Sequence, residues 1–247
     1  PGSTIKPLVA LAALEYGVVD EDMTRLCRGA FQLPGSSHRF RDWKKGGHGT
    51  VNMHAAIAQS CDGYFYGVAD RIGIDRMHEF LTRFGRGAAT GIDIRGERKG
   101  LVPSREWKKK SFKNKDLQTW FPGETVIFGI GQGFMTATPV QLAHAAAVIG
   151  SRGKNYKPRL VTALRDPMTS TRTPIEPILV EKVPVASPEN WQIAIDGMYA
   201  VTHGGTASRS AAGAPYSIAG KTGTAQVFTI AQNAKYNEKD IGEYLRD

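Results

Sequence analysis

Apolar residues recur at helical spacing in several stretches of the chain. The first begins at Ser3, ends near Tyr16 and is followed by Gly17, a residue type that commonly stops helices. Pro7 lies in its first turn, where the missing N–H costs little. The same periodicity predicts helices over Val51–Ser60, Tyr64–Gly73, Ile74–Phe84, Pro139–Ile149 and Trp191–Val201, with Thr138 as the N-cap of the helix that starts at Pro139.

Other stretches lack this period. Cys27–Gly49 is polar, cationic and glycine-rich, which predicts an irregular insertion, and Gly85–Gly123 is a long polar segment. Proline mixed with β-branched residues predicts short strands and turns over Lys157–Val185, and Tyr216–Phe228 has strand composition interrupted by glycines. Helices followed by strands predict an α/β or α+β fold, a helical cluster plus an antiparallel sheet.

Composition limits the chain to one good-sized domain. It has 247 residues, 41% of them hydrophobic, and no apolar run approaches the roughly 18 residues of a membrane span. The net charge of +9 predicts a solvated basic surface, with attraction to acidic polymers or anionic lipids as the alternative. Aromatic residues beside the basic clusters, such as Trp43 and Trp107, are not spaced like a base-stacking module, so we do not expect nucleic acid as a partner.

Three short motifs follow one another along the chain: Ser3–Lys6 (STIK), Ser60–Asp62 (SCD) and Lys221–Gly223 (KTG). Each motif is weak alone, and S-x-x-K occurs again at Ser151–Lys154, in a glycine-containing turn after a helix. Only the first copy opens an apolar helix. The order of the three motifs and the place of the first one therefore carry the prediction of a catalytic site.

The first motif suits a nucleophile and its base. Ser3 and Lys6 are three residues apart, so they share one helix face and their side chains are expected to meet. The positive end of the helix favours a developing oxyanion near Ser3 and disfavours a charged Lys6. Burial and a neighbouring Lys221 would act in the same direction, so that a neutral Lys6 takes the proton of Ser3 as the hydroxyl attacks a carbonyl.

The third motif suits substrate binding. Lys221-Thr222-Gly223-Thr224 falls in the predicted strand, whose edge would align an extended peptide by main-chain hydrogen bonds. Lys221 and Thr222 are expected to hold a substrate carboxylate, and Gly223 leaves room for a close approach. The backbone N–H of Thr224 would complete an oxyanion hole with that of Ser3.

The three motifs in this order resemble those of penicillin-binding proteins and class A β-lactamases. Further segments are similar to class B penicillin-binding proteins, in particular to the elongation-specific type: Gly129–Gly133, Thr136–Gln141, Arg41–Lys45, Gly91–Asp93 and Asp196–Tyr199. The resemblance covers nearly the whole chain. It implies that residues 1–247 form an incomplete transpeptidase domain with the penicillin-binding protein/serine β-lactamase-like fold, its sheet partly truncated at both ends.

This resemblance implies a peptidoglycan D,D-transpeptidase of cell-wall elongation. Ser3 would form an acyl-enzyme with stem peptides ending in D-Ala-D-Ala, transfer the acyl group to an amine acceptor, and be acylated by β-lactams. Ser60 would help to pass a proton to the leaving amine. Asp62 departs from the commoner Asn, and its carboxylate beside two lysines favours their charged forms. Substrate and β-lactam contacts are expected at Ser3, Ser60, Lys221, Thr222 and Thr224.

The same resemblance implies a place and partners for the protein. It implies the periplasmic face of the bacterial inner membrane, with an anchoring N-terminal segment that this chain does not contain. It also implies a membrane glycan polymerase and other elongation proteins as partners. No cofactor is expected to be required for the chemistry.

The chain has two cysteines: Cys27 begins the irregular insertion, and Cys61 lies inside the second motif. With Asp42 and His48 they form a ligand set that suits structural Zn²⁺, which would order a segment without a core of its own and brace the Ser60–Asp62 turn. We favour zinc, with His38 as a reserve ligand. A disulfide, permitted in the periplasm, and two unpaired buried thiols are the alternatives.

Two other functions fit the same motifs. A serine β-lactamase or D,D-carboxypeptidase would use water as the acceptor, and we find no residue to nominate as a deacylating base. A non-enzymatic β-lactam sensor would become acylated without transferring the acyl group. Rapid turnover of a penicillin adduct separates the first of these from a transpeptidase, and cross-linking activity separates the second.

Overall fold

The computed structural model describes residues 1–225. At its centre lies helix α1 (Lys6–Glu15), which follows a single 3-10 turn, η1 (Gly2–Ile5). Residues 6–13 are all buried, because apolar side chains cover the whole circumference of this helix. The helices packed around it are α2 (Met53–Ala58), α3 (Asp62–Ile72), α4 (Ile74–Thr82) and α8 (Glu189–Thr202).

The remaining helices extend this cluster outwards. Helix α6 (Pro122–Phe128) packs on α3, and α7 (Pro139–Gly150) lies near α8. Thr138 caps α7 as predicted, since its side chain accepts from the N–H of Gln141 in a capping box. The shorter elements are α5 (Arg105–Ser111), η2 (Lys115–Leu117) and α9 (Ser208–Ala211).

The segment predicted to be irregular, Cys27–Gly49, contains short antiparallel pairings instead of coil alone. Strand β1 (Arg25–Cys27) pairs with β4 (Gly49–Val51), and β2 (Ala30–Gln32) pairs with β3 (Arg39–Arg41). Phe31 faces Phe40 across the second pair, and both rings approach Tyr66 of α3. This aromatic contact supplies the anchor that the sequence pattern did not reveal.

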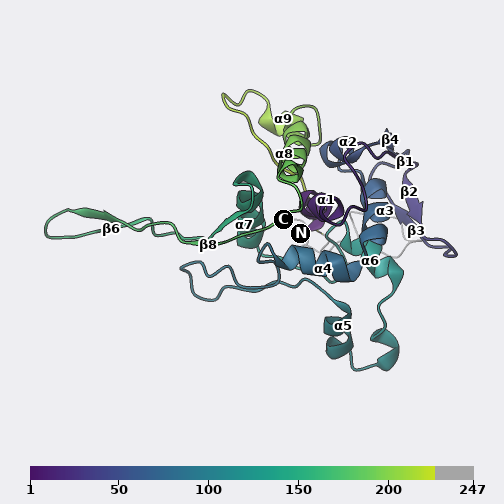
Figure 1. Cartoon of the computed structure of the whole chain (residues 1–247), viewed down its shortest axis with the longest axis horizontal. Coiled ribbons are helices and arrows are strands. Elements are labelled where there is room, and N and C mark those ends of the chain that lie inside the picture. Colours follow the sequence, from purple (N-terminus) through teal and green to yellow (C-terminus); the bar gives the residue numbers. More distant parts are fainter. Residues whose placement is uncertain (226–247) are drawn as a thin grey trace, which may run out of the picture.

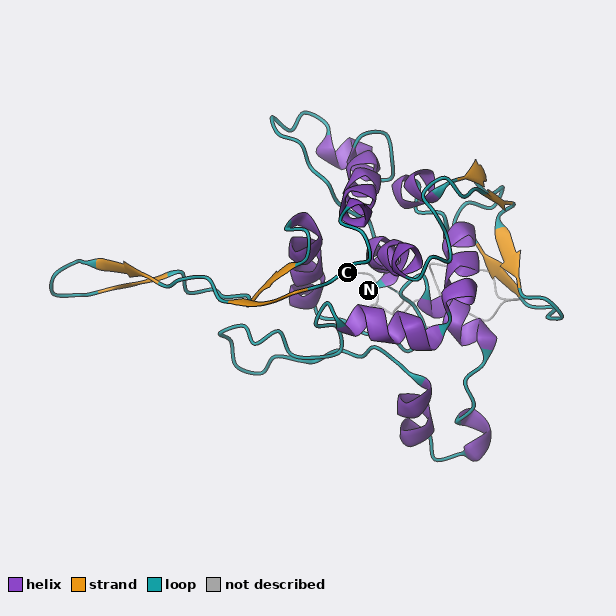
Figure 2. Ribbon diagram, in the orientation of Figure 1, coloured by secondary structure: helices purple, strands orange, loops and turns teal. Residues whose placement is uncertain are grey.

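Short strands and turns also form over Lys157–Val185, as predicted. Strand β5 (Lys154–Tyr156) pairs with β8 (Leu179–Lys182), and β6 (Ala163–Arg165) pairs with β7 (Arg172–Pro174). Together they form an arm that projects from the helical cluster in Figure 1, and Figure 2 shows that its strands stand apart from those beside α3. The described chain is thus a helical cluster with antiparallel pairs, a mixed α/β fold as expected.

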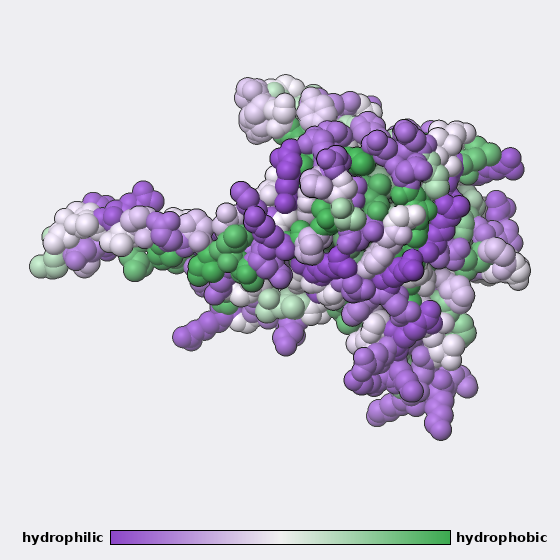
Figure 3. Space-filling view, viewed as in Figure 1, coloured by the Kyte–Doolittle hydropathy of each residue, from purple (hydrophilic) through white to green (hydrophobic). Residues whose placement is uncertain are grey.

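The two projections of the molecule differ in polarity. The lobe that carries α5 is strongly hydrophilic in Figure 3, and Lys109 and Lys110 are exposed there. The arm carries exposed apolar side chains, among them Leu164 and Met168. No helix in residues 1–225 is long and apolar enough to cross a membrane.

The strand predicted over Tyr216–Phe228 is wrong for its described part. Residues 217–225 belong to no strand, and the rest of the predicted strand lies outside the described residues. A strand requires a neighbouring strand whose backbone it can pair with. Here the N–H of Gly220 instead donates to the carbonyl of Met198 in helix α8, at 3.0 Å.

Candidate active site

Ser3 lies in η1, in a turn held between two distant segments. The N–H of Gly2 donates to the carbonyl of Gly131 at 2.9 Å. Gly2 has a φ of +56°, and a Cβ there would lie 2.3 Å from the backbone oxygen of Thr224. Only glycine permits both this backbone conformation and this approach. The residue before Ser3 therefore fixes the turn directly against the third motif.

Gly223 makes the matching approach from the other side. A Cβ at Gly223 would lie 2.5 Å from Cγ2 of Thr4 and 3.1 Å from its backbone nitrogen. The role predicted for this glycine was close approach, and the segment that contains it packs directly on the turn that carries Ser3. Residues separated by more than two hundred positions in sequence thus meet at one point.

The second motif brings Ser60 into the site through an unusual backbone conformation. Ser60 has a φ of +55°, which is uncommon and strained for a residue with a Cβ. It occupies the turn between α2 and α3, and its carbonyl accepts hydrogen bonds from Nζ of Lys6 at 2.8 Å and from Nε1 of Trp43 at 3.1 Å. These two donors hold the strained turn in place.

Lys6 is fully buried beneath this turn. Its Nζ donates to Oγ of Ser60 at 3.1 Å and to Oδ1 of Asp62 at 2.6 Å, in addition to the Ser60 carbonyl. Burial lowers the pKa of Lys6, and the Asp62 carboxylate opposes that shift, as the sequence predicted. The expected direct contact with Ser3 is not among the hydrogen bonds of the described residues, because Lys6 is turned towards the second motif and its carboxylate.

Lys221 is the second cation near the site. Its Nζ donates to the carbonyl of Thr222 at 3.1 Å and approaches Oγ1 of the same residue at 3.4 Å. Burial lowers the pKa of Lys221 to about 7, the charge of Lys6 adds to this effect, and Asp62 opposes it. Thr222 also contacts Thr206, with 2.7 Å between the two hydroxyl oxygens.

A cleft of about 690 Å³ joins these elements. Of the predicted site residues, those that line it are Ser3, Ser60, Asp62, Thr222, Gly223 and Thr224. Lys6 lies beneath its floor, and the ammonium of Lys221 reaches its wall through Thr222. The structure therefore brings residues from all three motifs to one cavity.

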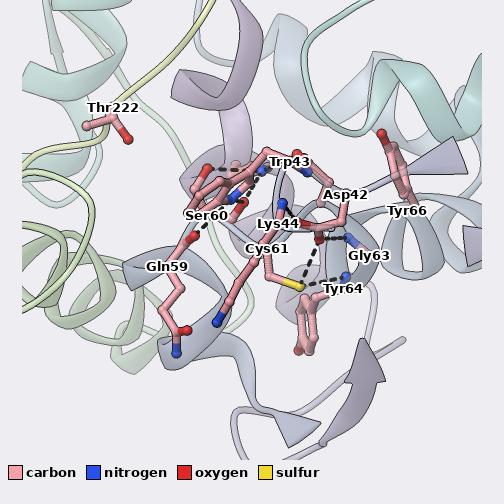
Figure 4. Close-up of polar contacts among 12 residues, drawn as sticks. Asp42, Trp43, Lys44, Gln59, Ser60, Cys61, Gly63, Tyr64, Tyr66 and Thr222 are labelled. Carbon is pink, nitrogen blue, oxygen red and sulfur yellow. Dashed lines mark hydrogen bonds and ion pairs between the residues drawn. The ribbon is translucent and has the colours of Figure 1, made fainter. Parts of the chain in front are cut away.

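The cleft also contains a residue, Trp43, to which the sequence assigned no role in the site. Trp43 is 59% exposed, yet its indole N–H donates to the carbonyls of Gln59 and Ser60, and its backbone N–H donates to Asp62. In Figure 4, Thr222 lies on a separate segment from this Trp43–Ser60 group. Two signals in the sequence pointed to Trp43, since it follows Asp42 directly and lies in the Arg41–Lys45 segment named in the sequence analysis.

Next to the second motif lies a cluster of Cys27, Asp42, His48 and Cys61. The ligand atoms of these residues all lie within 4.8 Å of one another. Oδ2 of Asp42 is 3.3 Å from Sγ of Cys27 and 3.5 Å from Sγ of Cys61, and Nδ1 of His48 is 3.8 Å from Sγ of Cys27. Both cysteines are free thiols, which contradicts the disulfide alternative. The reserve ligand His38 is not a member of this cluster.

The protonation of the cluster follows from its burial. Burial raises the pKa of the Cys61 thiol and lowers the pKa of His48. Burial also acts to raise the pKa of Asp42, but hydrogen bonds from the N–H groups of Gly63 and Lys44 outweigh it, so this pKa lies below its usual value. Figure 4 shows Asp42 and Cys61 directed towards each other beside the Ser60 turn.

Residues 1–244 match the family described as the penicillin binding protein transpeptidase domain. The chain belongs to this family. It is 45% identical to the peptidoglycan D,D-transpeptidase MrdA of Acinetobacter baumannii, an alignment that covers all of this chain and 36% of that protein. The chain thus spans little more than a third of the length of this curated relative.

Solved structures of penicillin-binding proteins have the same fold. Penicillin-binding protein 2 of Pseudomonas aeruginosa, in complex with WCK 5153, matches with a TM-score of 0.81 at 44% identity and covers 92% of this chain and 50% of that one. Penicillin-binding protein 2 of Helicobacter pylori, in complex with MreC, matches with a TM-score of 0.75 at 34% identity and covers 92% and 40% respectively. The family and fold implied by the motifs are therefore confirmed.

Proposed function

We propose that this chain is the catalytic domain of a peptidoglycan D,D-transpeptidase that acts in cell-wall elongation. The single observation that carries this proposal is the packing of Gly223 on Thr4, which sets the third motif against the turn of Ser3. The similarity to MrdA, named a D,D-transpeptidase, supports the same activity. The substrate would be a stem peptide ending in D-Ala-D-Ala.

Acylation would begin when Oγ of Ser3 attacks the carbonyl carbon of the penultimate D-Ala. The Ser3 proton would pass to the neutral form of Lys6, which burial favours and the Asp62 carboxylate opposes. The C–N bond to the terminal D-Ala would break as that amine receives a proton through Ser60. The 3.1 Å hydrogen bond between Lys6 and Ser60 supports this route. The acceptor amine would then attack the acyl carbon, the bond to Oγ of Ser3 would break, and the proton lost by the amine would return to Oγ through Lys6.

The third motif would bind the substrate and stabilise the intermediate. Backbone N–H groups of Ser3 and Thr224 would donate to the oxyanion. Lys221 and Thr222 would hold the terminal carboxylate. The Lys221 ammonium and the Thr222 hydroxyl lie 3.4 Å apart, so they would offer the carboxylate two adjacent donors. β-Lactams carry a similar carboxylate and would acylate Ser3 in the same position.

We also infer that Cys27, Asp42, His48 and Cys61 hold a structural Zn²⁺. Tetrahedral zinc with bonds of about 2.0–2.3 Å places its ligand atoms roughly 3.3–3.8 Å apart. Three contacts in the cluster lie at 3.3 to 3.8 Å, and all four ligand atoms lie within 4.8 Å of one another. The set of two sulfurs, one nitrogen and one carboxylate oxygen suits this metal. Such an ion would brace the Ser60–Asp62 turn and would take no part in the chemistry.

We further propose that the protein acts at the periplasmic face of the inner membrane, anchored by an upstream segment. The complex of the Helicobacter pylori relative with MreC supports partnership with elongation proteins. A membrane glycan polymerase is the other proposed partner, because cross-links are made on newly formed glycan strands.

Cross-linking of nascent glycan strands by the complete protein tests the proposed activity. We expect cross-links with wild type and none with Ser3→Ala. A wild-type protein that hydrolyses penicillin rapidly would instead support the β-lactamase or carboxypeptidase alternative. Stable acylation without any cross-linking, in the presence of the partner polymerase, would support the sensor.

A further inference from the structure

A second cavity, of about 190 Å³, lies behind the catalytic cleft. Its walls come from η1 and the start of α1, from α7, and from residues 219–221, which include Lys221 of the third motif. Most of the lining side chains are apolar, such as Leu8, Ala145 and Ile149. None of the lining residues carries a carboxylate, whereas one of them is Arg86.

The backbone around Arg86 directs its side chain inwards. Arg86 follows α4 and stands between Gly85 and Gly87, whose φ values are +66° and +79°. A Cβ at Gly87 would lie 3.3 Å from the backbone nitrogen of Val102, so the turn is packed closely against a neighbouring segment. These two glycines permit a tight turn that leaves Arg86 only 2% exposed.

Arg86 differs from the other buried cations of the described chain. Lys6 pairs with Asp62 and Lys108 pairs with Glu124. Both Nη atoms of Arg86 are buried without a hydrogen-bond partner among the described residues. A guanidinium keeps its charge in proteins, and a buried charge without a counter-charge is strongly unfavourable. The cavity therefore contains the cation of an ion pair, Arg86, but no anion among the residues that line it.

We propose that this cavity is a carboxylate-binding site in which Arg86 holds the carboxylate through both Nη atoms. A planar guanidinium binds a carboxylate by two parallel hydrogen bonds, which is the geometry that two free Nη donors offer. The volume is smaller than the roughly 300 Å³ at which drug-sized pockets begin, so it suits one carboxylate group on a short chain.

Two sources supply this chemistry. One is an Asp or Glu side chain from a part of the protein outside the described residues, and the other is a small free carboxylic acid. In either case the ligand would lie against Thr4 and Ile5, which follow Ser3, and against residues 219–221. It would thus stabilise the packing of the third motif on α1. An effect of this packing on acylation rests on the proposed function, whereas the binding of a carboxylate to Arg86 does not.

The direct test is a high-resolution crystal structure of the complete wild-type protein, grown with sodium acetate as the small probe. We expect a carboxylate within hydrogen-bond distance of both Nη atoms of Arg86. An Asp or Glu side chain there assigns the protein's own residue, and acetate there assigns a free acid. If neither is present, the proposal is wrong, whatever the activity of the protein.

Thermal unfolding of the same complete protein provides the solution test. With an internal carboxylate, Arg86→Met lowers Tm by about 5 °C or more, because the partner is left buried and unpaired, and acetate has no effect on wild type. With a free acid, acetate raises the wild-type Tm beyond chloride of equal ionic strength and leaves Arg86→Met unchanged.

Two further variants make the result interpretable. Arg86→Lys retains the charge, so partial recovery relative to Arg86→Met is expected even if the methionine variant folds poorly. Arg152→Met, at an exposed arginine that donates to Gln192, should change Tm by no more than about 2 °C. A fully stable Arg86→Met protein, together with a wild type that ignores acetate, would overturn the proposal.

Discussion

The Ser60–Asp62 turn separates two polar clusters that are satisfied in different ways. On one side the ammonium of Lys6 donates three hydrogen bonds of 2.6 to 3.1 Å, to the carbonyl and hydroxyl of Ser60 and to the carboxylate of Asp62. On the other side the ligand atoms of Cys27, Asp42, His48 and Cys61 lie within 4.8 Å of one another, with three contacts at 3.3 to 3.8 Å. The first cluster is complete within the protein, whereas the second is the group of ligand atoms at which we propose a Zn²⁺ ion.

We therefore expect the Lys6 cluster to act in acylation and the cluster of Cys27, Asp42, His48 and Cys61 to stabilise the structure. The Lys6 cluster reaches the cleft through Ser60 and Asp62, which both line it. The cluster of the two cysteines reaches the cleft through Asp42, and neither sulfur nor His48 is part of the lining. Changes on the Lys6 side should therefore alter acylation strongly, and changes on the sulfur side should alter metal content and stability first.

Ser3→Ala should reduce acylation by penicillin to background, a loss of up to about a million-fold, because the attacking oxygen is removed. The second S-x-x-K copy offers a matched control. Ser151 lies at the end of α7, where its hydroxyl donates to the carbonyl of Lys154 at 2.8 Å. Ser151→Ala should keep the wild-type acylation rate, and equal losses in both variants would contradict the assignment.

Lys6→Met should slow acylation by roughly 10²–10⁴-fold and should also destabilise the fold by about 3–5 kcal/mol, since Asp62 is left buried without its cation. The double variant Lys6→Met/Asp62→Asn separates these effects. It should recover most of the stability in denaturant unfolding while acylation stays slow. Recovery of both would show that Lys6 has a structural role alone.

Gly223→Ala should reduce the acylation rate by about a hundredfold or more, because its Cβ would meet Thr4 at 2.5 Å and displace the third motif by a fraction of an ångström to an ångström. Gly220→Ala in the same segment is the control, since nothing lies within 4 Å of a Cβ there. Stopped-flow acylation of both variants decides the point. Similar rates would mean that the close packing of Gly223 is not needed.

Metal analysis under non-reducing conditions should find about one zinc per protein, and a chelator should lower Tm by several degrees, because the ion links four segments. Cys27→Ser should weaken zinc binding by roughly 10–100-fold or more, whereas His38→Ala should not. Absence of zinc from a protein with two titratable thiols would favour the free-thiol alternative.

The smallest expected effect is on pH dependence. The pKa of Lys221 is lowered to about 7, so its ammonium is charged below that pH and neutral above it. Non-covalent binding of an anionic penicillin should therefore weaken by about tenfold between pH 6 and pH 9, the worth of one hydrogen bond to a charged group. Lys221→Arg, which stays charged, should flatten this profile, and an unchanged profile would contradict the role of Lys221.

The sequence predicted the features that depend on local order. The helix from Ser3, the Thr138 cap and the glycine requirement at Gly223 follow from short-range chemistry, and the structure has all three. The four-residue ligand set was found because few residues of the right type lie near Cys61. The paired strands of the 27–49 segment were missed because they are three residues long and are anchored by aromatic contact with α3.

Features that depend on distant segments could not be predicted. Trp43 enters the cleft only because β3 places the following residues beside the Ser60 turn, and Arg86 faces a cavity formed by helices far from it in sequence. The direction of Lys6 was also missed, since the strength of its pairing with Asp62 depends on a 2.6 Å distance that spacing does not give. The described part of the strand predicted from Tyr216 does not form, because composition supplies no pairing partner.

The central claim is that Ser3 is the nucleophile of a site formed by three distant motifs. Intact mass of the complete protein after penicillin treatment, followed by peptide mapping, tests it most directly. We predict one adduct per protein, located on the peptide that contains Ser3 and persisting over hours. No adduct in a folded protein, or an adduct mapped to Ser60 or to the peptide of Ser151, would contradict this account.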